Sequence, residues 1–355
     1  MSTTDVEKTA QALVADGKGI LAADETVPTV TKRLAALVIE STPESRRAYR
    51  EMLVMTPDLS RFVSGVILYD ETIRQADGHG TPLAEAITRA GIMPGIKVDT
   101  GAKPLAACPG ETVTEGLDGL RDRLKEYQSI GARFAKWRAV IRVSDHLPSE
   151  TCVEVNAQAL GRYAALCQEQ GLVPIVEPEV LMDGTHSLAR AEQVTAAVLE
   201  RVFHALYTQR VSLEGMLLKP NMVVPGKESA ERASVAAIAT ATLRVLSRHV
   251  PAAVPGIVFL SGGQDERRAT AHLNAMNAGS ATHPWRVSFS YGRALQDPAL
   301  EAWGGRASGV QAGQQALVHR ARCNSAASLG TYDESIETDT AEAGIASHRA
   351  QWSDD

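Results

Sequence analysis

The chain has 355 residues, of which 44% are hydrophobic, 22% charged and 5% aromatic, and its formal net charge is −6. This composition is typical of a globular enzyme and excludes disordered and fibrous proteins. The negative charge disfavours nucleic acid or an anionic membrane surface as the main partner, and the apolar runs are too short to span a membrane. No secretory signal is visible at the N-terminus, so we expect a cytoplasmic protein with no membrane partner.

Eight short apolar segments, each ending in polar or charged residues, are predicted to be buried strands. They span residues 19–25, 63–71, 92–101, 132–140, 172–179, 213–223, 256–264 and 285–295. Near-continuous apolar runs without clean alternation are typical of parallel strands that are covered on both faces. Helices rich in Ala, Leu, Glu and Arg are predicted between them, at residues 117–127, 156–169, 192–207 and 234–248.

This alternation of strand and helix predicts the fold class. A strand followed by a helix, repeated about eight times, is typical of an α/β protein with a single (β/α)8 TIM barrel. A doubly wound open sheet is the alternative, but it usually has a glycine-rich turn after its first strand, where this chain has AADE. We expect the barrel in residues 1–328 and a polar, acidic C-terminal tail in residues 329–355, either loosely attached or forming a short helix.

Charged side chains follow most of the predicted strands, and catalysis in TIM barrels takes place at these carboxyl ends. The pairs Lys136/Arg138 and Glu177/Glu179 are each two residues apart, so both members of a pair point to the same side of their strand. Charges inside apolar strands are costly unless they are paired. We therefore expect these side chains to meet in one polar pocket inside the barrel mouth.

Lysine is rare in this chain, with nine lysines against 27 arginines. Unlike arginine, lysine can lose its proton and act as an amine nucleophile. Because its usual pKa is ~10.4, it needs neighbouring cations or desolvation before it attacks a carbonyl at neutral pH. Lys219 ends the sixth predicted strand, and Lys136 and Lys97 are the expected neighbouring cations.

The last two predicted strands end in residues suited to a phosphate group. Ser261, Gly262 and Gly263 allow backbone N–H groups to approach an anion, and TIM barrels often hold phosphate at the loops after strands seven and eight. Arg293 ends the eighth strand and adds a planar charged group.

With these motifs in order, the chain resembles the class I fructose-bisphosphate aldolase family. The resemblance runs from about residue 17 to about residue 325 and rests on ILAADE, GIKVD, FAKWR, PIVEPE, LLKPNMV, FLSGGQ, SFSYGRALQ and AWGG. It implies a (β/α)8 barrel that cleaves fructose 1,6-bisphosphate reversibly into dihydroxyacetone phosphate and glyceraldehyde 3-phosphate through a lysine Schiff base. It also implies sugar phosphates as ligands and a homotetramer. No metal and no cofactor are expected, since the nine histidines show no metal-ligand spacing.

The resemblance implies a role for each matching residue. Lys219 would form the Schiff base, and Asp24 would take the proton from the C4 hydroxyl. Glu177 would move protons during carbinolamine formation and dehydration, with Glu179 holding the lysines in place. Lys136, assisted by Arg138, would stabilise the charges that develop. The phosphate contacts would come from two groups of residues: Ser261, Gly262, Gly263, Ser290 and Arg293 for the C1 phosphate, and Lys97, Arg33 and Thr29 for the far phosphate.

Two departures from the family pattern and two alternatives remain open at this point. Residues 26–29 read Thr-Val-Pro-Thr where the family commonly has a Ser-Thr-Gly-Ser type of run, and the last tyrosine is Tyr332, so no C-terminal catalytic tyrosine is assigned. The alternatives are another Schiff-base sugar-phosphate aldolase, of the transaldolase or deoxyribose-phosphate aldolase kind, and an aldolase with an added scaffold role. Trp137 is expected to point outward as packing, and the four single cysteines are expected to be reduced and structural.

Overall fold

Eight parallel strands close into a barrel in the computed structural model, which describes residues 3–279 and 282–338. Around the barrel each strand pairs in parallel with its neighbours, in the order β1, β2, β3, β6, β7, β8, β9, β10 and back to β1. The strands are Gly19–Ala23, Val63–Leu68, Met93–Lys97, Phe134–Ile141, Val173–Val180, Leu217–Leu218, Gly256–Phe259 and Arg286–Tyr291. The predicted (β/α)8 barrel is confirmed, and each of the eight strands lies inside its predicted segment or extends it by one residue.

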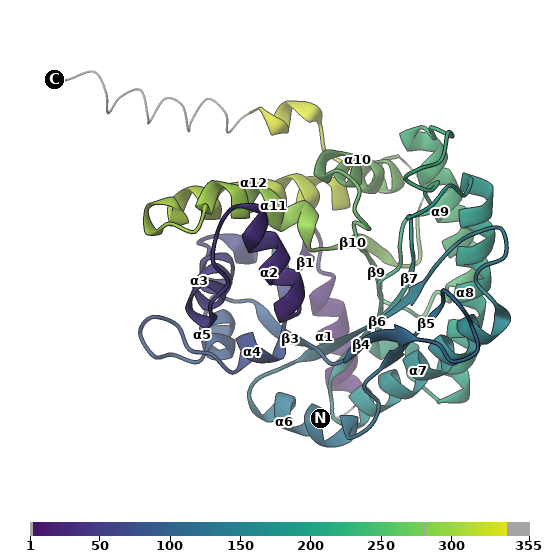
Figure 1. The fold of residues 1–355 in the computed structure, drawn as a ribbon, viewed down its shortest axis with the longest axis horizontal. Coiled ribbons are helices and arrows are strands. Elements are labelled where there is room, and N and C mark those ends of the chain that lie inside the picture. Colours follow the sequence, from purple (N-terminus) through teal and green to yellow (C-terminus); the bar gives the residue numbers. More distant parts are fainter. Residues whose placement is uncertain (1–2, 280–281, 339–355) are drawn as a thin grey trace.

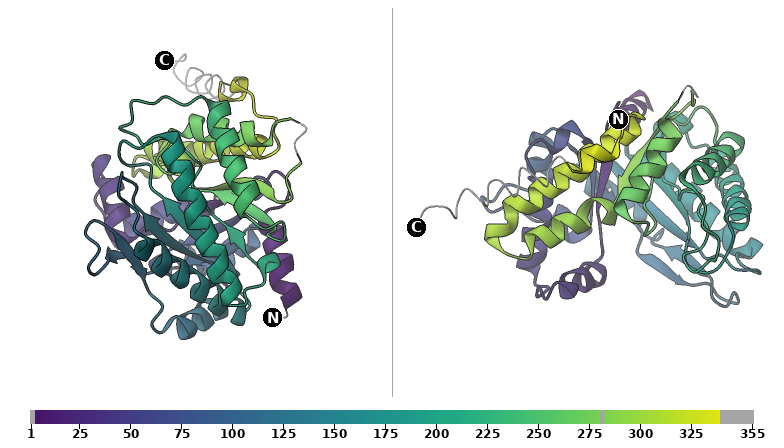
Figure 2. Two further views of the ribbon diagram at one scale, coloured as in Figure 1. Left: turned by 90° about the vertical axis from the view of Figure 1, so that its right-hand side faces the viewer. Right: turned by 90° about the horizontal axis from the view of Figure 1, so that it is seen from above.

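Helices surround this barrel on all sides (Figures 1 and 2). In Figure 1, α2 and α3 lie on the left, α7 below, α8 and α9 on the right, and α10 to α12 above. The α-helices are α1 Thr3–Leu13, α2 Val27–Ala36, α3 Pro43–Val54, α4 Asp70–Ile73, α5 Leu83–Arg89, α6 Leu120–Ser129, α7 Glu150–Glu169, α8 Leu188–Thr208, α9 Val235–His249, α10 Glu266–Asn277, α11 Arg293–Trp303 and α12 Val310–Ser328. Four short 3-10 helices, η1 to η4, span Leu59–Arg61, Leu213–Gly215, Ala307–Gly309 and Glu334–Glu337. The four predicted helices correspond to α6, α7, α8 and α9.

The amino end of the barrel is filled by apolar side chains, several of them from the N-terminal helix. Val6, Ala10 and Leu13 of α1 are buried in one cluster with Ile20, Ile67, Phe134, Val173, Ile175, Leu217 and Val258 from the strands. Gly65 and Gly95 make room there, because a side chain on either would run into the ring of Phe134. The sequence pattern did not predict this helical plug.

Alternate residues of β6 face opposite sides, as its period of two requires. Phe134 belongs to the barrel interior, whereas Ala135 and Trp137 belong to the cluster between strands and helices. The ring of Trp137 packs on Tyr163 of α7, with 5.6 Å between ring centroids. The prediction that Trp137 points outward is therefore confirmed, and Lys136 and Arg138 must point inward.

A two-stranded antiparallel hairpin outside the barrel was also not predicted. Its strands are β4 (Gly101–Pro104) and β5 (Thr112–Glu115), and it follows β3. The Thr114 hydroxyl donates to the backbone carbonyl of Arg138 (2.8 Å), and its backbone N–H donates to the Asn156 side chain (3.2 Å). The hairpin is thus fixed against β6 and α7, beside the carboxyl end of the barrel.

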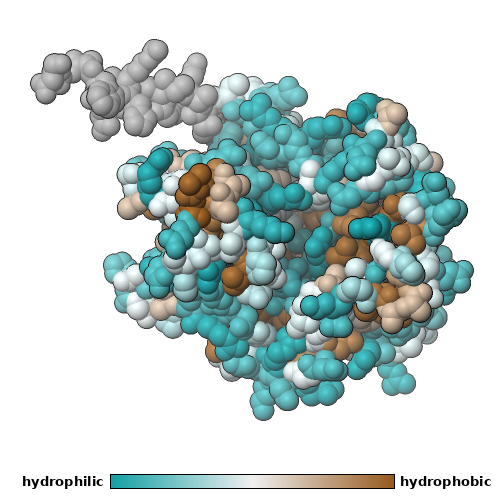
Figure 3. Space-filling view, in the orientation of Figure 1, coloured by the Kyte–Doolittle hydropathy of each residue, from teal (hydrophilic) through white to brown (hydrophobic). Residues whose placement is uncertain are grey.

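The first residues of the predicted tail are attached to the barrel. Glu337 in η4 is buried and accepts two hydrogen bonds of 2.6 Å from Arg320 on α12, and Tyr332 donates a third of 2.8 Å. The rest of the predicted tail, residues 339–355, lies outside the described residues. Hydrophilic residues dominate the face of the molecule seen in Figure 3, and none of the described helices combines the length and apolar character needed to cross a membrane.

Candidate active site

Four strands carry the same pattern of inward-facing residues, apolar below and charged at the carboxyl end. In β1 the series is Ile20, Ala22 and then Asp24, and in β8 it is Leu217 followed by Lys219. In β6 Phe134 precedes Lys136, and in β7 Val173 and Ile175 precede Glu177. Because side chains alternate along a strand, each charged residue lies directly above the apolar plug.

Glu177 lies between two buried lysines at the centre of this mouth. Its carboxylate oxygens are 3.3 Å from the Lys219 Nζ and 3.2 Å from the Lys136 Nζ. The Lys136 Nζ is in turn 2.9 Å from the Asp24 carboxylate. The side chains of Lys136, Lys219 and Glu177 are at most 5% exposed. The structure therefore brings together the four residues expected to do the chemistry, as two carboxylates and two lysines in one dry cluster.

The charges of this cluster shift one another's protonation. Burial alone would raise the pKa of Asp24, but Lys136 and Lys219 outweigh burial and lower it to about 2. Burial opposes ionisation of Glu177 too, yet the cations Lys136, Lys219 and Arg138 lower the pKa of its carboxyl. Burial would lower the pKa of Lys136, but Asp24 and Glu177 raise it well above its usual range. At neutral pH both acids are therefore carboxylates and Lys136 stays an ammonium.

A second layer of ion pairs lies around the cluster. Glu179 pairs with Arg138 through its carboxylate, and Lys97 pairs with Asp99 and donates to the Asp99 carbonyl (2.8 Å). Burial and the charge of Lys136 lower the pKa of Lys97. Glu177 contacts both lysines, whereas Glu179 pairs with Arg138, so the expected role of Glu179 in holding the lysines stays a prediction.

The residues predicted for the first phosphate lie at the ends of β9 and β10. Ser261 and Gly262 line the same cavity as Lys219, together with Ser290 and Arg293, and this cavity measures about 630 Å³. Gly262 and Gly263 have φ angles of +61° and +87°, which only glycine adopts without strain, so the turn depends on both. The Ser290 hydroxyl is buried without a hydrogen-bond partner, so it is free to donate to a ligand oxygen.

At the opposite side of the cavity, the residues predicted for the far phosphate are less free. Arg33 lies on α2 and is paired with Glu25 and with Asp297, which is 2.5 Å away. The Thr29 hydroxyl is 3.0 Å from that of Thr26. Both residues line the cavity, but a phosphate would have to compete with the carboxylates for Arg33.

Two features of this side were missed by the sequence reasoning. Lys32 also lines the cavity and is exposed. The sequence signal that could have identified it is the basic pair Lys32–Arg33 that follows AADE. Glu25 joins Arg33 to the buried Arg50, 2.5 Å away on α3, a contact no local pattern reveals. Asp70 pairs with Arg74, and Glu71 with Arg46, so both acids behave as structural residues outside the cavity.

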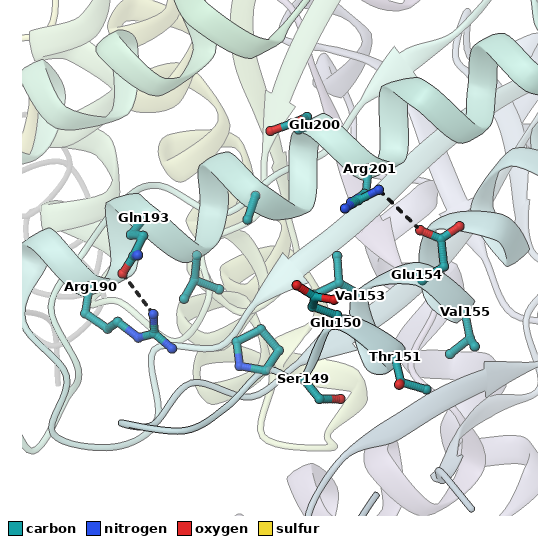
Figure 4. Close-up of a pocket in the computed structure, with 13 residues that line it drawn as sticks. Ser149, Glu150, Thr151, Val153, Glu154, Val155, Arg190, Gln193, Glu200 and Arg201 are labelled. Atoms are coloured by element: carbon teal, nitrogen blue, oxygen red, sulfur yellow. Dashed lines mark hydrogen bonds and ion pairs between the residues drawn. The ribbon is translucent and has the colours of Figure 1, made fainter.

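Other parts of the described chain offer weaker candidates. A groove of about 610 Å³ lies between α7 and α8 (Figure 4). Two of its charged side chains already have partners in the groove: Arg201 lies 4.0 Å from Glu154, and Arg190 donates to Gln193. One group with metal-ligand side chains, His319, Cys323 and Glu337, is found among the described residues. The group lies on α12 and η4. Both oxygens of the Glu337 carboxylate already accept hydrogen bonds from Nη1 of Arg320.

The cysteines agree with their predicted structural role. Cys152, Cys167 and Cys323 are buried, Cys108 is half-buried, and all four are free thiols. Burial raises the pKa of Cys152 to about 12 and that of Cys323 to about 11, so neither is a ready thiolate at neutral pH.

Comparisons with known proteins point to one family. Residues 5–352 match the family model described as glycolytic fructose-bisphosphate aldolase class I. The chain is 56% identical to a probable fructose-bisphosphate aldolase class 1 of Xanthomonas axonopodis pv. citri, over 94% of this chain and 99% of the relative. It is 51% identical to fructose-bisphosphate aldolase 2 of Caenorhabditis elegans, over 92% of this chain and 90% of that protein.

A solved structure agrees with these relatives. The fold matches fructose-bisphosphate aldolase from Plasmodium falciparum, solved in complex with TRAP and a small-molecule inhibitor, with a TM-score of 0.91 and 45% identity, over 93% of this chain and 95% of that one. A transaldolase-like or deoxyribose-phosphate aldolase-like enzyme is not what these matches indicate. The closed barrel, the charged mouth and the family match lead to one conclusion: the chain belongs to the class I fructose-bisphosphate aldolase family.

Proposed function

We propose that this enzyme cleaves fructose 1,6-bisphosphate through a Schiff base on Lys219, and that it catalyses the reverse condensation at the same site. The observation that carries the proposal is the position of Glu177 between Lys219 and Lys136, 3.3 and 3.2 Å from their amines. An amine and a carboxylate in contact inside a dry cavity are the minimum machinery for forming and dehydrating a carbinolamine.

Lys219 is the best nucleophile among the three cavity lysines that lie in or directly after the barrel strands. Lys136 carries a raised pKa and two carboxylate contacts, so it remains an ammonium and cannot attack. The ammonium of Lys97 is bound to the carboxylate and the carbonyl of Asp99. Lys219 adds to the C2 carbonyl of the ketose. Glu177 is placed to take the proton that the amine loses and to give one to the departing hydroxyl, which leaves as water.

Carbon–carbon cleavage then uses the protonated imine. As the C3–C4 bond breaks, its electrons move into the imine to form an enamine, and the C4 hydroxyl becomes an aldehyde by losing its proton. Asp24, kept ionised by Lys136 at 2.9 Å, is the base for that proton. With a pKa of about 2 it accepts the proton only when the breaking bond makes the hydroxyl strongly acidic. Protonation of the enamine and hydrolysis of the imine then release dihydroxyacetone phosphate.

The phosphates and the assembly complete the proposal. Ser261, Gly262, Ser290 and Arg293 would bind the C1 phosphate, and Lys32, Arg33, Lys97 and Thr29 line the side where the far phosphate would lie. Sugar phosphates are then the small-molecule partners. We infer a homotetramer, and a cytoplasmic location like that of the Arabidopsis thaliana relatives named cytosolic, at 53% and 51% identity.

Borohydride trapping tests the proposal directly. The protein is incubated with dihydroxyacetone phosphate, reduced with borohydride and digested, and the modified peptide is located by mass spectrometry, with and without EDTA. We expect one label, on Lys219, of equal yield in both samples. A matched control is Lys125→Met, which removes an exposed lysine from α6 and should leave the label unchanged. Label on another lysine, or none, would contradict the proposal.

A further inference from the structure

A second cation lies at the turn that follows β9, in addition to Arg293. A methyl group placed on the α-carbon of Gly263 would lie 2.8 Å from an Nη2 of Arg293 and 2.9 Å from the Nζ of Lys227. Both positive nitrogens therefore converge on one face of the Ser261–Gly263 turn. Lys227 is also one of only nine lysines in a chain with 27 arginines.

The backbone around Lys227 is held by the loop between β7 and α8. The N–H of Lys227 donates to the carbonyl of Met182 (2.7 Å), and the residues on either side donate to the loop between β7 and α8 as well. Gly226 is packed so closely on Gly184 that a methyl group there would lie 2.1 Å from a carbonyl oxygen. The base of the Lys227 side chain is thus held next to the turn, and only its outer part is free to move.

The Ser261–Gly263 turn is itself held by a side-chain hydrogen bond. The Gln264 side chain donates to the Ser261 carbonyl (3.1 Å) and contacts His272 Nδ1 through its own oxygen (2.6 Å). Burial lowers the pKa of His272 to about 4, so the ring is neutral and adds no charge near the turn. Neutral groups therefore hold the turn in place, and the positive charge beside it comes from Arg293 and Lys227.

These two cations are not balanced by buried acids. In residues 3–279 and 282–338 no carboxylate lies within ion-pair distance of the Arg293 guanidinium, and Lys227 pairs with Asp183 at 3.1 Å. The Asp183 side chain is 63% exposed and that of Lys227 39%, so water screens this pair and it is easily exchanged. Two like charges that meet at an open glycine turn favour an anion between them.

We propose that Lys227 is a further ligand of the phosphate at this turn, and that its ammonium moves from Asp183 to the phosphate when the ligand binds. This rests on the proposed function, which puts the C1 phosphate at Ser261 and Gly262. Lys227 is then a residue that sets affinity for the phosphorylated end of the ketose, while Lys219 and Glu177 carry out the chemistry.

The same trapping reaction separates the two proposals. We would measure the concentration of dihydroxyacetone phosphate that gives half-maximal labelling of Lys219, for the parent enzyme and for Lys227→Met. We expect that concentration to rise about three- to tenfold, the usual effect of losing one partly exposed charge-assisted contact. Lys227→Arg should restore most of the affinity. For dihydroxyacetone, which lacks the phosphate, parent and Lys227→Met should label alike.

The outcomes are distinct for each proposal. If the parent enzyme labels on Lys219 but Lys227→Met shows the same half-maximal concentration, the role of Lys227 is wrong and the proposed function stands. An equal loss for dihydroxyacetone would show a structural effect of Lys227 and would also overturn the inference. If the parent gives no label on Lys219, the proposed function itself fails. The exposed Lys125→Met variant is the control for removing one positive charge and should match the parent.

The exchange of partners has its own test. Asp183→Asn removes the competing carboxylate, so half-maximal labelling should then need about half as much dihydroxyacetone phosphate, and inorganic phosphate should compete more strongly. An unchanged or higher concentration would rule out the movement of Lys227 from Asp183.

Discussion

The two ends of the barrel interior are filled by opposite kinds of side chain, apolar at the amino end and charged at the carboxyl end. At the amino end, Leu13 and Phe134 fill the space with carbon, and glycines on the neighbouring strands make room for the phenyl ring. At the carboxyl end, the same strands place Asp24, Lys136, Glu177 and Lys219 in a cluster that is almost as dry. The apolar end contributes stability through burial, whereas the charged end is arranged for reactivity. Substitutions at the two ends should therefore affect different measurements.

The largest effect is expected at the charged end, from Lys219→Met. Loss of the amine removes the covalent intermediate, so the rate of fructose 1,6-bisphosphate cleavage should fall by at least about 10³-fold, as for other covalent nucleophiles. Coupled-enzyme kinetics would measure this, with circular dichroism to establish that the fold is intact. Retention of even a tenth of the parent rate would mean that the charged cluster does not work through Lys219.

A somewhat smaller loss is expected for Glu177→Gln. The amide keeps the shape but cannot take or give the proton that Glu177 would transfer, so kcat should fall about 10²- to 10³-fold. Glu179→Gln is the matched control, two residues away on the same face of β7 but paired with Arg138 instead of the lysines. Its loss of kcat should be at least tenfold smaller. Equal losses would mean that contact with the lysines does not distinguish the two acids.

The apolar end should respond in stability, not in chemistry. Leu13→Ala opens a cavity beside Phe134 and Gly65, and the free energy of unfolding should fall by about 2–4 kcal/mol. Urea denaturation followed by fluorescence measures this, and kcat/KM at 25 °C should remain that of the parent. A drop in kcat/KM without a drop in stability would show that the plug also sets the position of the catalytic cluster.

The smallest effect concerns how pH acts on the charged end. Asp24 has a lower pKa in the folded chain, about 2, than its ordinary 3.8, so its ionisation stabilises the fold above pH 3.8 and this contribution is lost as the pH falls towards 2. The contribution is about 2 kcal/mol at neutral pH, and about 1 kcal/mol of it is lost by pH 3. The difference in unfolding free energy between parent and Asp24→Asn should shrink by that amount between pH 5 and pH 3. A constant difference would mean that Asp24 does not carry the lowered pKa.

Most of the barrel could be predicted from the sequence, because its strands follow from local periodicity, whereas most of the site roles came from the family resemblance and stay predictions. Inward-facing residues repeat every second position, so Lys136 and Glu177 were assigned to the interior from spacing alone. Spacing did not tell Glu177 from Glu179, since both face inward and only the pairing of neighbouring strands decides which one reaches the lysines. The ion pair of Arg33 with Asp297 was not predicted either, because the two residues are 264 positions apart and local spacing says nothing about their contact.

Elements without apolar periodicity could not be predicted in this way. The strands β4 and β5 of the hairpin are only four residues long and have one buried residue, Thr114, whose contacts with Arg138 and Asn156 set the place of the hairpin. The attachment of Glu337 likewise depends on Arg320 and Tyr332, which belong to other parts of the chain. In both cases long-range hydrogen bonds determine a structure that has no signature in its own residues.

The alternation along β6 also has a consequence for how this gene can change. Phe134, Lys136 and Arg138 face the interior and Ala135 and Trp137 the helices, so the strand is read in steps of two. Inserting a single codon between Phe134 and Lys136 would leave Phe134 in the plug but move the lysine to the Trp137 position, where it faces Tyr163, and the indole to the Arg138 position, where it faces Glu179. A substitution here alters one side chain, whereas inserting or deleting one residue would move every later side chain of the strand to the opposite face. Only length changes of two residues would keep each side chain of this segment on its own face.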